Sequence, residues 1–190
     1  MVDLVEKAKL HFLETFESSD PNVRLYDELP RHVAILEKWA KHLLKSHPEA
    51  DEDILLSSVW LHDIGQLVGE REEDHAVRSE REVLRFLPTL NIPEDLVRKI
   101  AHCVRAHRCK DVQPNSIEAK LLAAADSVSH FTDIVYIDMA NKLGKEEPLA
   151  KLERDYRDIG LLPELKSEIA PLYKSWKSLL SNYPAWFLSE

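Results

Sequence analysis

Apolar residues recur at intervals of three and four positions along most of this 190-residue chain, which is the spacing of one face of an α-helix. Residues 3–18 show the pattern, with Val5, Ala8, Phe12 and Phe16 on one side. No alternating segment of useful length indicates a strand, and the chain has only four glycines. The pattern therefore predicts an all-α fold of roughly seven or more helices with no significant sheet.

Prolines, glycines and capping residues divide this pattern into separate helices. Pro30 in the first turn and Pro48 just past the end bound the second helix. Gly65 is expected to end the third in a left-handed cap, and Pro171 to kink or restart the last. The helices are expected at about 3–18, 30–47, 51–65, 74–87, 93–108, 116–143 and 163–181.

The length predicts a single domain over residues 1–190, because a chain of this size buries about 70% of its unfolded surface. Its core helices are expected at about 30–135, with flanking helices at 1–18 and about 145–190. The aromatic end at 183–187 is expected to seal this core, and a homodimer contact is the alternative.

The net charge of −9 argues against a nucleic-acid polymer as a partner, because such binders normally present a basic face. The net charge does not exclude small phosphorylated substrates. No stretch approaches the roughly 20 apolar residues of a membrane span, and the N-terminus lacks the apolar core of a signal peptide. No membrane partner and a cytoplasmic location are therefore expected.

The dipeptide His62–Asp63 stands at the end of the apolar run 54–61. Two strongly polar side chains are costly to bury there unless a partner satisfies them. An imidazole beside a carboxylate suits a hard or borderline divalent metal. The dipeptide alone is a weak signal, so its meaning depends on inward-facing partners elsewhere in the chain.

Helical phase selects candidate partners among the nine histidines. His32 lies on the apolar face of its helix, and His107 continues the apolar stripe of the helix at 93–108. His75 lies at the flank of an apolar face. From this position, a site residue and a solvent-exposed residue at the start of a helix are equally good interpretations of His75. The other histidines considered are expected to cap helices, line the core edge or face solvent: His11, His42, His47 and His130.

Asp126 is the carboxylate that most needs a partner. It follows Leu121–Ala125 in a helix that is apolar nearly all round and therefore central in the domain. A carboxylate in such a helix requires a cation or several hydrogen-bond donors. A structural aspartate bonded to a backbone amide is the alternative.

Taken in order, His32, His62–Asp63 and Asp126 resemble the H…HD…D pattern of the HD-domain superfamily of metal-dependent phosphohydrolases. Leu61–Gly65 is similar to its central motif, and the resemblance covers about residues 30–135. It implies an all-helical HD-type domain in which these four residues bind metal, with His62 and Asp63 at the catalytic centre.

The chain also resembles the two-metal members, in which further histidines follow the HD pair. His75 and His107 fall where those extra ligands are expected. If both bind, Asp63 bridges two metals, and if neither binds, the site is mononuclear. Histidine and carboxylate ligands suit one or two divalent ions of Mn, Fe, Co, Ni or Zn better than an all-oxygen magnesium site.

The implied activity is hydrolysis of a phosphate ester or anhydride in a small phosphorylated metabolite, a nucleotide among the candidates, by metal-activated water. Arg108 is the first candidate for a bidentate phosphate contact and Lys120 the second, with a solvated charge as the alternative for both. Some nucleotidase members place a glutamate three residues after the HD pair, where this chain has Gln66. Any general acid or base must come from elsewhere, with Glu70, Glu73 and Asp74 as open choices.

Two other functions remain open. The six-residue set also resembles the di-iron site of HD-fold oxygenases such as the inositol oxygenases. A non-catalytic module that senses a metal or a nucleotide is the third hypothesis. Metal content and oxygen dependence discriminate among these functions.

Overall fold

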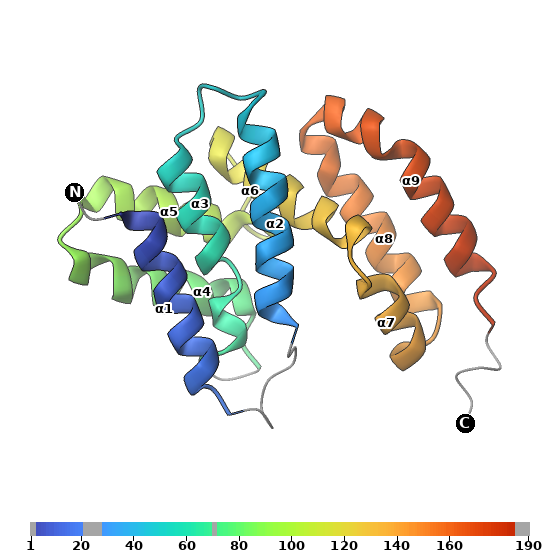
Figure 1. Cartoon of the computed structure of the whole chain (residues 1–190), viewed down its shortest axis with the longest axis horizontal. Helices are drawn as coiled ribbons and strands as arrows, with labels where there is room; N and C mark the ends of the chain where they lie inside the picture. The colour runs from blue at the N-terminus through green and yellow to red at the C-terminus, as the bar shows by residue number, and fades with distance from the viewer. Residues whose placement is uncertain (1–2, 21–27, 70–71, 185–190) are drawn as a thin grey trace. The chain divides into compact units, whose positions relative to one another are not determined.

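The computed structural model describes residues 3–20, 28–69 and 72–184 (Figure 1). Within them it contains nine α-helices, four short 3-10 helices and no strand, which confirms the all-α prediction. No helix in these ranges is long and apolar enough to cross a membrane. The α-helices are α1 (Leu4–Ser18), α2 (Leu29–Leu44), α3 (Glu52–Leu61), α4 (His75–Phe86), α5 (Glu94–Ala106), α6 (Ile117–Ser129), α7 (Val135–Leu143), α8 (Glu146–Asp158) and α9 (Pro163–Ser181).

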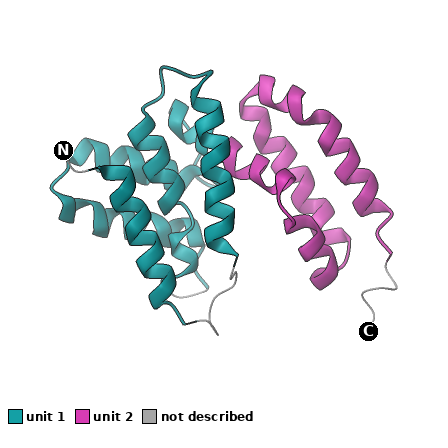
Figure 2. Ribbon diagram, in the orientation of Figure 1, with its two compact units in different colours: residues 1–123 teal, residues 124–190 magenta. Residues whose placement is uncertain are grey.

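The contacts divide the chain into two compact units, residues 1–123 and 124–190 (Figure 2). The first unit contains α1 to α5 and the first part of α6, and the second contains the rest of α6 with α7 to α9. Each unit buries apolar side chains of its own. The expectation of one domain over residues 1–190 stays a prediction.

Helix α3 is the central helix of the first unit. The Asp51 side chain begins it by accepting a hydrogen bond from the Ile54 N–H (3.1 Å). Every residue from Ile54 to Gly65 is buried, and α3 contacts α1, α2 and α5. The mostly apolar residues from Ile54 to Leu61 need such enclosure, so the C-terminal end of α3 carries His62 and Asp63 into the interior.

The predicted role of Gly65 is wrong. Helix α3 already ends at Leu61, and Gly65 lies in a 3-10 helix at Ile64–Gln66 without a positive φ. A Cβ at this position would stand 2.2 Å from the His75 carbonyl oxygen and 2.6 Å from the Ser79 nitrogen. The glycine is therefore required for the close approach of α4, and not for a left-handed cap.

The predicted single helix at 116–143 is interrupted between α6 and α7. The Ser129 hydroxyl donates to the Asp126 carbonyl (2.7 Å), and the Thr132 hydroxyl donates to the Ser129 carbonyl (3.1 Å). A 3-10 turn follows α6, after which Asp133 is extended. Short polar side chains that bond nearby carbonyls compete with a continuous helix, which explains the break.

The C-terminal helix α9 runs through Pro171 without a restart. Beyond it the Tyr183 hydroxyl donates to the Asn141 side-chain oxygen (2.6 Å). Trp186 and Phe187 of the predicted aromatic seal lie outside the described residues, so that role stays a prediction.

Candidate metal centre

Three helix ends in the first unit gather four of the predicted site residues. His62 and Asp63 directly follow α3, His75 is the first residue of α4, and His107 directly follows α5. The ends meet because α5 packs against both α3 and α4. Asp63 Oδ1 lies 3.1 Å from His75 Nε2 and 3.7 Å from His107 Nε2, and Asp63 Oδ2 lies 3.5 Å from His62 Nε2.

His62 and His107 are held by the same capping arrangement. Nδ1 of His62 donates to the Val59 carbonyl (2.8 Å), and Nδ1 of His107 donates to the Val104 carbonyl (2.6 Å). Each bond satisfies a carbonyl in the last turn of a helix, where no backbone N–H reaches it. Because a carbonyl only accepts, Nδ1 of each ring carries a hydrogen, and Nε2 is the ring atom that faces Asp63. The helix ends thus direct the Nε2 atoms of two histidines at Asp63.

His32 completes a second group of ligand atoms. It lies on α2, and its ring centre is 5.5 Å from that of His62. The ligand atoms of His32, His62 and Asp63 lie within 4.8 Å of one another, and so do those of Asp63, His75 and His107. Asp63 belongs to both groups, as a bridging carboxylate would, and this role stays a prediction.

The electrostatics of the centre favour a cation. Burial raises the pKa of the Asp63 carboxyl, but the neighbouring His62, His75 and His107 outweigh it and hold this pKa well below its usual range. Burial lowers the pKa of His75, but the Asp63 charge and hydrogen bond outweigh it and raise that pKa. The nitrogens of His75 and His107 stand 3.3 Å apart. An ionised carboxylate among converging imidazole nitrogens fits a divalent transition metal.

Gln66, three residues after Asp63, contacts the Asp63 carboxylate. Its side-chain N–H donates to Asp63 Oδ2 (2.5 Å). The backbone of Asp63 has φ −109° and ψ 8°, in the sparsely allowed bridge region where many active-site residues sit. Some nucleotidase members of the resembled family carry a glutamate at the position of Gln66. In this chain the Gln66 amide instead donates a hydrogen bond that orients the Asp63 carboxylate.

Arg108 forms an ion pair with Asp74. Its Nη1 donates to Asp74 Oδ2 (2.5 Å), and Lys110 Nζ lies 3.4 Å from the same oxygen. Burial raises the pKa of Asp74, but the Ala76 N–H and Arg108 outweigh it and hold this pKa well below its usual range. Asp74 is thus ionised, and both of its oxygens already accept hydrogen bonds. A carboxylate without a proton is a poor general acid, which argues against this role for Asp74. The phosphate contact of Arg108 stays a prediction.

The other proposed acid–base residues are only partly described. Glu73 pairs with Arg81 on α4 (2.7 Å), and Glu70 lies outside the described residues. Lys120 is half-buried on the part of α6 that belongs to the first unit. Its predicted contact with a phosphate stays a prediction.

Asp126 lies on the part of α6 that belongs to the second unit. It is partly buried, and His130 Nε2 lies 3.8 Å from its Oδ1, one helical turn further on. Its predicted role as a ligand stays a prediction.

A buried polar cluster in the second unit was not predicted. Tyr136 donates its hydroxyl hydrogen to Asp155 (2.7 Å), and Asp155 also pairs with His130 (3.1 Å) and Lys151 (3.2 Å). Burial raises the pKa of Asp155, but the charges of His130 and Lys151 outweigh it and lower this pKa. His130 is thus a buried network residue, and the i,i+4 spacing of Lys151 and Asp155 was the available sequence signal.

Asp155→Asn is expected to lower the free energy of unfolding by about 3 kcal/mol, because it leaves the partly buried Lys151 ammonium group without its carboxylate partner. The stability that the ionised Asp155 carboxylate contributes is fully present above the carboxyl pKa of the unfolded state. It is lost as pH falls through the lower pKa of the folded state. Urea unfolding at several pH values measures both effects. Asp138→Asn, which removes an exposed pair with Lys142, is the control, and equal losses in the two variants would contradict the prediction.

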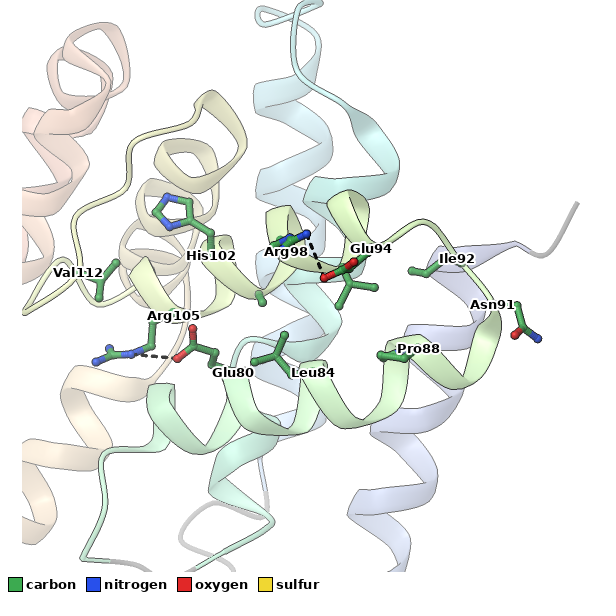
Figure 3. Close-up of a pocket in the computed structure, with 12 residues that line it drawn as sticks. Glu80, Leu84, Pro88, Asn91, Ile92, Glu94, Arg98, His102, Arg105 and Val112 are labelled. Carbon is green, nitrogen blue, oxygen red and sulfur yellow. Dashed lines mark ion pairs between the residues drawn. The ribbon is translucent and has the colours of Figure 1, made fainter.

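A surface groove of about 980 Å³ lies between α4 and α5 (Figure 3). Arg105 pairs with Glu80 across it, and Arg98 pairs with Glu94 along α5. Its lining includes none of the predicted site residues. The predicted site residues therefore lie outside the lining of this groove.

The fold is all-helical, and its first unit holds two groups of histidine and aspartate residues that could bind a metal ion. The HD domain family model matches residues 31–130, which is more than half of the chain. The chain therefore belongs to the HD-domain family, whose members are generally metal-dependent hydrolases. Comparison with curated proteins and with solved structures finds no match.

Proposed function

We propose that this protein is a metal-dependent phosphohydrolase that cleaves a phosphate ester or anhydride bond of a small phosphorylated metabolite, a nucleotide among the candidates. The observation that carries the proposal is the convergence of His62, His75 and His107 nitrogens on the buried Asp63 carboxylate. Family membership supports metal-dependent hydrolysis in general, and the phosphate substrate is the further step.

Two groups of residues would hold the metal. His32, His62 and Asp63 would form one subsite, with Asp126 as its expected further ligand, and Asp63 would join His75 and His107 in the other. A bound Mn, Fe, Co, Ni or Zn ion supplies a Lewis acid and lowers the pKa of water towards neutrality. Gln66 keeps the shared carboxylate oriented.

The residues that would bind the phosphate are cationic. Arg108 has five N–H groups and gives one of them to Asp74 at 2.5 Å, so others are left for a phosphate oxygen. Lys120 would add a point charge from α6. Together they would neutralise the substrate and position it beside the centre.

Removal of metal should reduce hydrolysis of phosphorylated compounds to the level of the uncatalysed control, and titration of one of the five metals back should restore it. The experiment combines metal analysis of protein purified without added metal with a screen of phosphorylated metabolites. Hydrolysis that survives complete metal removal would contradict the proposal.

The same screen, run in air and without oxygen, tests the other two functions. Hydrolysis is expected to be independent of oxygen. Bound iron with oxygen-dependent turnover would favour an oxygenase, and tight nucleotide binding with no turnover in any metal would favour a sensor module.

A further inference from the structure

The ion pair of Asp74 with Arg108 joins the two histidine-bearing segments next to the centre, and Lys110 lies 3.4 Å from the same Asp74 oxygen. Asp74 immediately precedes His75, and Arg108 immediately follows His107. Their side chains meet at 2.5 Å although the residues are 34 positions apart in the chain. We call this pair the Asp74–Arg108 clasp.

Both carboxylate oxygens of Asp74 are used. Oδ1 accepts from the Ala76 N–H (3.0 Å) and caps the first turn of α4, while Oδ2 accepts from Arg108. The residue that begins the helix of His75 is therefore the residue that Arg108 holds. The position of His75 depends on the position of this helix end.

His75 has more need of such a restraint than His107. The His75 side chain is 24% exposed, whereas that of His107 is 2% exposed and anchored by Nδ1 to Val104. The nitrogens of the two rings must stay within about the 3.3 Å seen here to share one ion with Asp63. A restraint between the two segments controls this distance directly.

We propose that Asp74 and Arg108 are positioning residues that set the separation of His75 and His107, and thereby the affinity of the metal subsite formed by these two histidines and Asp63. The inference rests on the proposed two-metal function. Outer residues that orient metal ligands typically change metal affinity about 10–100-fold when they are removed. The subsite of His32 and His62 has no residue in the clasp, so its affinity should stay unchanged.

Asp74→Asn is the most selective variant, because asparagine caps a helix about as well as aspartate but lacks the charge that holds Arg108. Metal-free protein is titrated with Co²⁺, followed by calorimetry and by visible absorption. Wild-type protein should take up two equivalents. In Asp74→Asn the affinity for one equivalent should fall about 10–100-fold while the other is unchanged.

Variants of Arg108 test whether the two residues act as a unit. Arg108→Gln should reproduce the effect of Asp74→Asn, and the double variant should lose no more than either single variant. Arg108→Lys keeps the charge and should retain part of the affinity. Losses that add in the double variant would overturn the clasp.

Two controls match the chemistry of the changes. Arg81→Gln removes an arginine–carboxylate pair with Glu73 from the same helix, and Asp3→Asn changes the N-cap of α1. Both should bind two equivalents like the wild type. If both Asp74→Asn and Arg108→Gln bind two equivalents of Co²⁺ with wild-type affinity, the clasp is overturned but the two-metal function is not. If the wild type binds only one equivalent of Co²⁺, the two-metal function on which the clasp rests is overturned.

Discussion

Asp63→Ala is expected to abolish metal binding and hydrolysis together. Asp63 is buried and is the only residue common to the two ligand groups found in the first unit among the described residues. Its loss removes the charge that balances the bound ions, so metal affinity should fall by more than the roughly 10–100-fold typical of outer residues. Metal content after dialysis and the rate of substrate hydrolysis measure the two effects.

The matched control is Asp111→Ala. Asp111 follows the end of α5, and its exposed carboxylate pairs with Arg105 on that helix. It should keep both metal and activity, because surface pairs of this kind contribute little. Asp63→Asn separates charge from shape, since the amide is nearly isosteric but neutral. Retention of both metals in either Asp63 variant would show that this carboxylate is not the shared ligand.

Gly65→Ala is expected to destabilise the first unit and to weaken metal binding at the same time. The new methyl group would stand 2.2 Å from the His75 carbonyl oxygen and 2.6 Å from the Ser79 nitrogen. Both are backbone atoms, so α4 itself must move and carry His75 away from Asp63. Overpacking of this kind costs about 1–3 kcal/mol and occasionally more. Thermal unfolding and Co²⁺ titration of the same preparation measure both effects.

Gly160→Ala provides the control for the substitution itself. Its methyl group would meet the Lys166 ammonium nitrogen at 3.1 Å, at the end of a flexible side chain that can move aside. Its stability should therefore stay within about 0.5 kcal/mol of the wild type. If Gly65→Ala proves as stable and as competent in metal binding as Gly160→Ala, the close approach of α4 does not position His75.

Helical periodicity alone was enough to predict that the His107 side chain points inward. Its place on the stripe of Ile100 and Val104 agrees with a side chain that is only 2% exposed. His75 was ambiguous, because a residue at the first turn of a helix has no complete apolar face around it. Only the contact of its ring with Asp63 at 3.1 Å places it in the centre.

The sequence by itself determined the helical class, the apolar run that buries His62 and Asp63, and the HD pattern with His32 and Asp126. Periodicity reports which face of a helix turns inward. The tertiary structure alone decided that the ends of α3, α4 and α5 meet, that Gly65 makes room for α4, and that Asp74 reaches Arg108. Such contacts join residues far apart in the chain, so their distances depend on how the helices pack and not on the pattern within any one of them.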